Sequence, residues 1–183
     1  MHDSTTMLAE RFTSERLVLR RPEPADATAI YERYAASEAV TRYLSWPRHR
    51  SIDDTRAFLA FADTAWAQWH AGPLLIEERE TGLLVGSTGV AFQTPYRVDT
   101  GYVLAEDAWG QGYASEALAA VLAALAGTTV WRVEAFCHPE HAASTSVLEK
   151  AGFELDGRLR RHTVFPNLAP EPQDVFVYSR ILW

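Results

Sequence analysis

The sequence predicts a single α/β domain in which helices cover the faces of one sheet. Strand-like and helix-like segments are mixed along the chain, which is typical of such layered folds. The 183 residues are 48% hydrophobic and include six Trp and eight Phe, enough for one packed core. No repeat, low-complexity tract or linker divides the chain. We therefore expect a loose start over residues 1–11, followed by one domain over residues 12–183.

Hydrophobic spacing and turn residues predict the elements in order. A first strand at 17–20 is ended by Pro22 and Pro24, and helices follow at 26–36 and 53–70. In the second of these helices, apolar residues recur at helical spacing: Phe58, Phe61, Ala62, Ala65 and Trp69. Further elements are expected as a hairpin at 74–79 and 83–93, a strand at 100–104, a helix at 112–126, a strand at 130–137, a helix at 143–151 and a strand pair at 154–164 and 174–182.

Composition excludes several classes of function. The formal net charge of −7 argues against nucleic-acid binding, which depends on neutralising phosphates. The longest apolar run, at 117–126, has about half the length of a membrane span. The first residues lack a signal-peptide pattern, and Cys137 is the only cysteine, so no internal disulfide can form. We therefore expect a cytoplasmic protein that is a monomer or a homodimer.

The segment at 102–117 carries the clearest chemical signal. A strand ends, a polar turn follows, and Gly110 and Gly112 open a helix. Glycines let backbone N–H groups approach a ligand closely, and the first N–H groups of a helix lack internal partners. Together they make an anion site suited to a pyrophosphate. The same residues are also consistent with a plain strand-to-helix connection.

Two other nucleotide motifs were compared with this segment. A P-loop is excluded because no Gly-Lys-Ser/Thr follows the glycines. A dinucleotide fingerprint over Gly110, Gly112 and Ser115 fits less well, because five residues separate Leu104 from Gly110. In addition, Glu134 lies inside its predicted strand and not at the end, where it would meet a ribose.

Residues 109–117, with the sequence WGQGYASEA, resemble the acetyl-CoA motif of the GCN5-related N-acetyltransferase (GNAT) family. They are most similar to the bacterial branch that acetylates the N-termini of ribosomal proteins. Residues 139–153 resemble a second motif of that branch, and residues 14–20 resemble its opening. The resemblance covers residues 12–182. It implies a mixed, mostly antiparallel sheet flanked by helices, with a splayed strand pair for acyl-CoA.

The resemblance also implies acetyl-CoA as co-substrate, without a metal. The pantetheine arm would bind backbone groups of Val103 and Leu104, and the pyrophosphate would bind the turn that starts the helix. Besides Val103 and Leu104, the expected cofactor-binding residues are Trp109, Gly110, Gln111, Gly112, Tyr113, Ala114, Ser115 and His141. His141 stands where the family has Asn.

Ser144 and Asp99 are the predicted catalytic residues. By resemblance to the ribosomal branch, Ser144 would assist the leaving thiol, although a serine at a helix start is equally consistent with a helix cap. An amine must lose a proton to attack, and a carboxylate can accept it. Asp99 and Glu77 are the candidate bases, and each is also consistent with a purely structural role.

Cys137 invites two further interpretations. With His138 and His141 it has the spacing of a metal site, but adjacent strand residues point to opposite faces and no fourth ligand is evident. Cys137 could also carry the acetyl group as a nucleophile. A small buried hydrophobic residue is the simpler interpretation.

By resemblance, the acceptor pocket lies between residues 43–47 and the loop at 165–173, with Tyr43 and Trp46 in its wall. Glu171 and Asp174 add negative charge. We expect direct transfer to a small primary amine or a protein N-terminal α-amine, within a ternary complex. A non-catalytic acyl-CoA sensor or scaffold and a dinucleotide-dependent oxidoreductase remain as alternatives.

Overall fold

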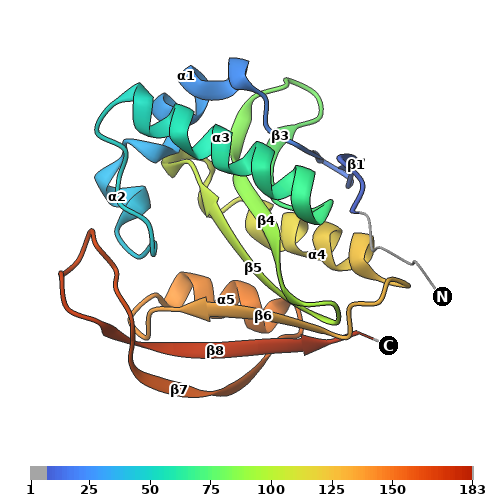
Figure 1. Cartoon of the computed structure of the whole chain (residues 1–183), viewed down its shortest axis with the longest axis vertical. Helices are drawn as coiled ribbons and strands as arrows, with labels where there is room; N and C mark the ends of the chain where they lie inside the picture. The colour runs from blue at the N-terminus through green and yellow to red at the C-terminus, as the bar shows by residue number, and fades with distance from the viewer. Residues whose placement is uncertain (1–7, 183) are drawn as a thin grey trace.

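The computed structural model describes residues 8–182, which form one eight-stranded sheet with the strand order β1-β2-β3-β4-β5-β6-β8-β7 (Figure 1). The strands are β1 (Arg11–Thr13), β2 (Leu17–Arg20), β3 (Pro73–Glu78), β4 (Leu84–Thr94), β5 (Arg97–Leu104), β6 (Arg132–Cys137), β7 (Glu154–Thr163) and β8 (Gln173–Ile181). Every neighbouring pair is antiparallel except β5 and β6. The predicted mixed, mostly antiparallel sheet is therefore confirmed.

The one parallel pair is also the point where the sheet opens. Strands β5 and β6 pair only at Arg97–Asp99 and Arg132–Glu134. Beyond these residues β5 continues to Leu104 and β6 continues to Cys137, and the two strands no longer pair with each other. The predicted splayed strand pair is confirmed, and it leaves backbone polar groups free along both inner edges.

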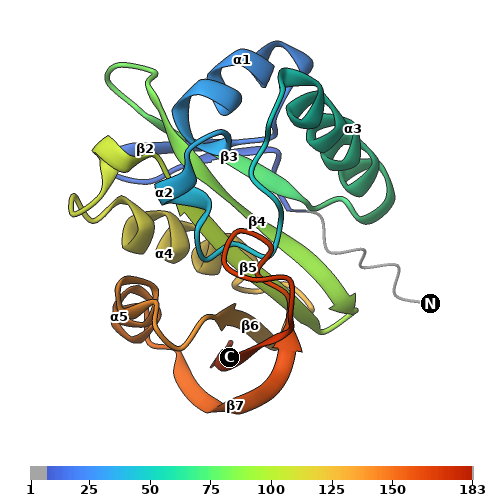
Figure 2. The ribbon, with the colours of Figure 1, turned by 90° about the vertical axis from the view of Figure 1, so that its left-hand side faces the viewer.

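Helices cover both faces of the sheet, with α1 and α3 on one face and α4 and α5 on the other (Figure 2). The α-helices are α1 (Ala27–Ile30), α2 (Glu38–Thr41), α3 (Ile52–Trp69), α4 (Tyr113–Leu125) and α5 (Ala142–Lys150). Helix α1 continues as a π-helical turn over Tyr31–Ala35, so the predicted helix at 26–36 is interrupted in its hydrogen-bond pattern. Among residues 8–182, no helix is long and apolar enough to cross a membrane.

Helix α3 has two apolar stripes. The stripe that packs into the core contains Leu59, Ala62 and Trp66, all buried. Of the residues singled out by spacing, Phe61 and Trp69 are instead exposed. The periodicity predicted the helix correctly but did not show which stripe faces the core.

The N-terminal part of the described chain is ordered before residue 12. Residues 1–7 of the expected loose segment lie outside the described range, whereas Leu8 is buried and its N–H donates to the carbonyl of His70 at 3.0 Å. Arg11 already belongs to β1. The loose start therefore does not extend to residue 11, because β1 pairs with β2 from that residue onward.

Candidate functional site

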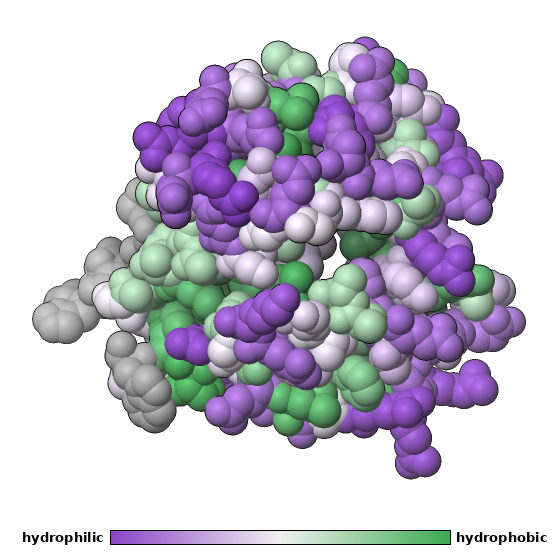
Figure 3. Space-filling view, turned by 180° about the vertical axis from the view of Figure 1, so that it is seen from behind, coloured by the Kyte–Doolittle hydropathy of each residue, from purple (hydrophilic) through white to green (hydrophobic). Residues whose placement is uncertain are grey.

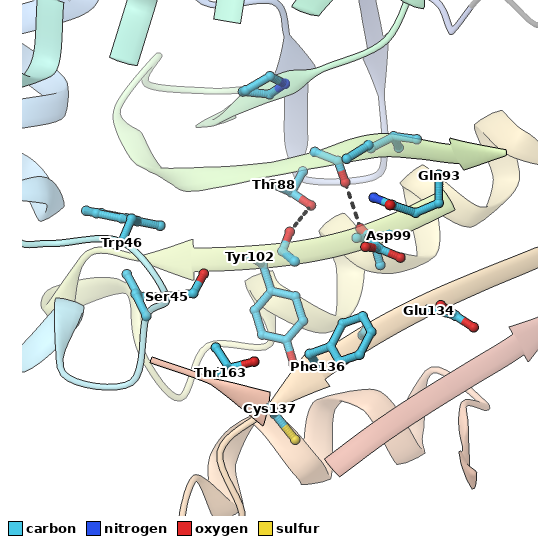
Figure 4. A pocket seen from close by; sticks show the side chains of 18 of the residues that line it. Ser45, Trp46, Thr88, Gln93, Asp99, Tyr102, Glu134, Phe136, Cys137 and Thr163 are labelled. Carbon is cyan, nitrogen blue, oxygen red and sulfur yellow. Dashed lines mark hydrogen bonds between the residues drawn. The ribbon is translucent and has the colours of Figure 1, made fainter. Parts of the chain in front are cut away.

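A cleft of about 1160 Å³ occupies the opening between β5 and β6. Its walls come from α3, β4, β5, β6, α5 and β7, and the space-filling view shows the molecule hollowed there between an upper and a lower part (Figure 3). Tyr102, Asp99 and Glu134 lie on the strands that border the opening (Figure 4). The residues predicted as catalytic, Ser144 and Asp99, both line this cleft.

The turn before α4 has the backbone geometry of an anion site. Gly110 and Gly112 have φ values of 73° and 82°, which residues with a Cβ adopt at a cost. Gly112 is the N-cap of α4, so the N–H groups of the following residues point out of the helix. Within the described chain, the N–H groups of Gly110, Gln111 and Gly112 donate no hydrogen bond. The turn therefore offers a row of unpaired donors suited to phosphate oxygens.

Side chains from distant segments hold this turn in place. The Arg16 guanidinium donates to Glu116 at 2.7 Å and to the carbonyl of Gln111 at 3.0 Å. Arg33 binds both carboxylate oxygens of Asp107 at 2.8 Å. Sequence reasoning missed these arginine contacts, because their partners lie between 74 and 100 residues away along the chain.

Ser144 lies across the cleft opening from β5. It is the third residue of α5, whose N-cap is His141, so the interpretation of Ser144 as the helix N-cap is wrong. The Tyr102 hydroxyl lies 3.0 Å from both the Ser144 Oγ and the Ser144 carbonyl oxygen. Burial raises the pKa of Tyr102, which keeps its hydroxyl protonated and able to donate. The sequence predicts the strand that contains Tyr102 but no role for the Tyr102 side chain.

His141, which replaces the family's Asn, forms part of an aromatic cluster. Its ring stacks on Tyr43 with 4.7 Å between centroids, and His138 lies 5.2 Å from the same ring. Burial lowers the pKa of His141, which favours the neutral imidazole. The predicted acceptor residue Tyr43 and the predicted cofactor residue His141 therefore lie together in the cleft wall.

Cys137 is buried on the inner side of β6, with its Sγ 3.9 Å from the Thr145 hydroxyl. Burial raises the pKa of its thiol, so the nucleophilic thiolate is disfavoured. His138, a second member of the candidate metal motif, accepts a hydrogen bond from the N–H of Glu140. Within residues 8–182, no three His, Cys, Asp or Glu side chains are grouped so as to hold a metal ion.

Asp99 and Glu134 lie opposite each other on β5 and β6, at the last paired position before the strands part. Glu134 accepts from Arg132 at 2.6 Å, whereas one oxygen of Asp99 is buried without any hydrogen-bond partner. Burial, reinforced by the charge of Glu134, raises the pKa of Asp99. Glu77, the other candidate base, is engaged in an ion pair with Arg20 at 2.6 Å and does not line the cleft. Asp99 is therefore the better placed of the two.

The predicted acceptor segments lie side by side and are tied together by one side chain. The Asn167 amide donates to the carbonyls of Thr41 and Trp46 at 2.7 and 2.9 Å, and its oxygen accepts from the N–H of Arg48 at 2.9 Å. Trp46 lines the cleft. Asp174 does not contribute charge there, because it pairs with Arg158 at 2.8 Å beside a separate, smaller cavity.

Known proteins with similar sequences are N-acetyltransferases by name. The chain is 29% identical over 169 residues to the uncharacterized N-acetyltransferase YoaA of Bacillus subtilis (strain 168), covering 91% of this chain and 93% of that protein. It is 28% identical over 154 residues to the uncharacterized N-acetyltransferase p20 of Bacillus licheniformis, covering 82% and 86%.

Solved structures share the fold. A GNAT-family acetyltransferase from Bacillus anthracis matches with a TM-score of 0.80 and 25% identity over 93% of this chain and 98% of that one. RimL, a ribosomal L7/L12 α-N-protein acetyltransferase solved with coenzyme A, matches with a TM-score of 0.84 and 24% identity over 94% and 98%. The family description "Acetyltransferase (GNAT) domain" matches residues 16–154, and the chain therefore belongs to the GNAT acetyltransferase family.

Proposed function

We propose that the protein transfers the acetyl group of acetyl-CoA directly to a primary amine, which is a small molecule or a protein N-terminus. The observation that carries this proposal is the position of two features relative to β5. Unpaired N–H groups lie in the turn at Gly110–Gly112, which follows the end of β5 at Leu104, and the partnerless carboxylate oxygen of Asp99 lies on β5 where that strand borders the cleft. The first suits the pyrophosphate of the co-substrate, and the second suits an amine that must lose a proton.

Each protein group then has a separate task in the transfer. The turn and the first N–H groups of α4 would hold the pyrophosphate, and the inner edge of β5 near Val103 and Leu104 would bind the pantetheine amides. The Leu104 carbonyl oxygen already accepts from the Trp109 indole N–H at 3.0 Å, so the arm would bind the groups of this edge that remain unpaired. A backbone N–H of that edge would also stabilise the negative charge that develops on the thioester carbonyl oxygen. Holding both substrates in this geometry supplies a large part of the rate increase.

Asp99 and Ser144 would accept and donate the protons of the transfer. The nitrogen of the neutral amine forms a bond to the carbonyl carbon, and Asp99 accepts the proton that the nitrogen loses. The carbon–sulfur bond breaks, and the sulfur takes the electron pair and then a proton from the candidate donor on the β5–α5 wall, the Ser144 hydroxyl, whose oxygen regains a proton from solvent. The leaving thiol resembles cysteine, with a pKa of about 8.5, so it leaves without much help.

A thiol-release assay with a panel of primary amines tests the proposed function. Acetyl-CoA should release free thiol only when an amine is present, and the acetylated amine should be recovered in equal amount. Acetyl-CoA binding without thiol release from any amine would instead support the sensor or scaffold alternative. A melting temperature raised by NAD(P) but not by acetyl-CoA would support the oxidoreductase alternative.

Replacing Cys137 with alanine is expected to leave most of the activity. The thiol is buried and its pKa is raised, and among the described residues its hydrogen-bond contact is with the Thr145 hydroxyl at 3.9 Å, which is not a base that could activate it as a nucleophile. Steady-state kinetics should show the intersecting pattern of a ternary complex in both proteins. A ping-pong pattern, or an acetylated Cys137 found by mass spectrometry, would contradict direct transfer.

Removing the Ser144 and Tyr102 hydroxyls is expected to have non-additive effects. Ser144→Ala should lower kcat about 10- to 100-fold, below the usual range for general acid–base catalysis, because a thiolate is a fair leaving group. Tyr102→Phe should lower kcat by a similar factor, because the Tyr102 hydroxyl orients the Ser144 hydroxyl through the 3.0 Å contact. The double variant should then lose little more than either single variant.

Tyr178→Phe is the matched control for the single and double variants of Ser144 and Tyr102. Its hydroxyl also bonds from the sheet to α5, at 3.2 Å from Glu149, but Tyr178 does not line the cleft. Equal losses of kcat in Tyr178→Phe and Tyr102→Phe would show that loosening α5 explains the effect. Fully additive losses for Ser144 and Tyr102 would show that the two hydroxyls act separately.

A further inference from the structure

We propose that the acceptor is a small primary amine with a bulky aromatic or apolar body, and that this body binds the cleft-facing aromatic stripe of α3. The proposal rests on the proposed acetyl transfer and narrows its acceptor to one chemical class. It is carried by three features: an exposed row of rings on α3, opposing rings on the sheet side, and carboxylates at the floor between them.

The α3 stripe consists of Phe58, Phe61, Ala65 and Trp69, which follow each other at intervals of three and four residues and all line the cleft. Phe61 is 63% exposed and Trp69 is 51% exposed, although the core stripe of the same helix is well buried. Neighbouring exposed aromatic side chains beside a cleft mark a binding surface, because their exposure has a free-energy cost that a ligand removes.

Rings also line the opposite side of the same cleft. Phe92 and Phe136 come from β4 and β6, whereas Trp46 lies on the α3 side. The Trp46 ring lies 5.3 Å from that of His49, which in turn lies 6.4 Å from Phe58. The Phe136 ring stacks flat on His162 of β7, with 5.7 Å between centroids and 3° between planes, which fixes its orientation. A flat apolar group on the acceptor can therefore contact ring faces on both sides.

Charged side chains lie at the floor of this aromatic space. Asp99 and Glu134 are neighbours across β5 and β6. Glu134 pairs with Arg132 at 2.6 Å and lies 3.9 Å from Arg97. The carboxylate of Asp99, with its unpaired buried oxygen, is left to receive the polar end of a ligand. An amine bound there would place its nitrogen at the point where the strands part, with its apolar body directed toward α3.

A peptide acceptor fits the same surface poorly. Peptide groups that leave water need hydrogen-bond partners, and extended peptides find them at free strand edges. On the acceptor side, β4 is paired with β5 along its length and with β3 as far as Gly89, so β4 leaves a peptide only a short edge at residues 91–94. The free inner edges of β5 and β6 are those assigned to the pantetheine arm. A small amine with few polar groups avoids this cost.

The test is a series of unbranched and phenyl-terminated primary amines of similar basicity and increasing length, compared with peptides that begin with Ser or Ala. We expect kcat/KM to rise about fourfold for each added methylene that reaches the rings, until the cleft is filled. Binding of the same amines, followed by tryptophan fluorescence in the presence of coenzyme A, should show the same trend without requiring turnover.

Phe61→Ala and Trp69→Ala should flatten this dependence on length while leaving kcat/KM for the shortest amine within about twofold. Trp131→Ala is the matched control, because Trp131 is 58% exposed and does not line the cleft. A flat length series in both turnover and binding, or a preference for the peptides, would overturn this inference. If thiol release with short amines persists in that case, the proposed acetyl transfer stands without it.

Discussion

Replacing Gly112 with valine is expected to abolish the rise in melting temperature that acetyl-CoA gives the native protein. A ligand at 100 times its Kd stabilises the folded state by about 2.7 kcal/mol, which corresponds to about 5–10 °C for a chain of this size. Gly112 has a φ of 82° at the start of α4, and a β-branched residue there is strained by about 1–3 kcal/mol. The new side chain would also stand in front of the N–H groups that are expected to bind the pyrophosphate.

Gly82→Val separates these two effects. Gly82 has a φ of 71° in the turn between β3 and β4, and a Cβ placed there meets no atom within 4 Å, so valine introduces similar strain away from the cleft. Both variants should melt at a lower temperature than the native protein in the absence of ligand. Only Gly112→Val should lose the response to acetyl-CoA. A full response in Gly112→Val would rule out this turn as the pyrophosphate site.

The cofactor half of the candidate site could be predicted from the sequence because its signals are local. Gly110 and Gly112 are separated by one residue at the start of a helix, and their positive φ values follow from the turn that they form. The branching of β5 from β6 could also be expected, because the resemblance over residues 109–117 brings a known sheet arrangement with it. Neither inference required knowledge of a contact between distant residues.

The acceptor half could be predicted only in outline, because it depends on contacts between distant segments. The helical spacing of Phe61 and Trp69 is compatible with packing into the core or with lining a cleft, and only the position of α3 on the sheet distinguishes the two. The contacts of Asn167 with Thr41 and Trp46 join residues more than 120 positions apart. Asp174 was predicted to add negative charge to the acceptor pocket, but it pairs with Arg158 and lines a separate cavity.

The choice between Asp99 and Glu77 illustrates the same limit of local patterns. Both are carboxylates on strands near the predicted site, and the sequence does not show which has a partner. In the structure, Arg20 binds Glu77 and Asp26 together, and Glu77 does not line the cleft in which the acceptor would bind. Asp99 has one buried oxygen that no group satisfies. An unsatisfied buried group is costly, and such groups gather at functional sites.

Replacing Asp99 with asparagine is accordingly expected to lower kcat/KM about 10²- to 10⁴-fold and to remove the acidic limb of its pH profile. Burial and the charge of Glu134 raise the pKa of Asp99 above the ordinary value of about 3.9. Activity should therefore fall as the pH drops through this raised pKa, because the protonated carboxyl group cannot accept a proton. The profile should be measured with a weakly basic fluorinated alkylamine, so that ionisation of the acceptor does not mask the limb.

Three comparisons make this result specific. Glu134→Gln should keep the limb but move it to lower pH, because it removes the charge that raises the pKa of Asp99. Glu77→Gln breaks the Arg20 ion pair and should affect stability but not the limb. A raised pKa means that the charged form of Asp99 weakens the fold above that pKa, so Asp99→Asn should melt no lower than the native protein at neutral pH. A retained limb in Asp99→Asn, or a lower melting temperature with unchanged kcat/KM, would assign Asp99 a structural role instead.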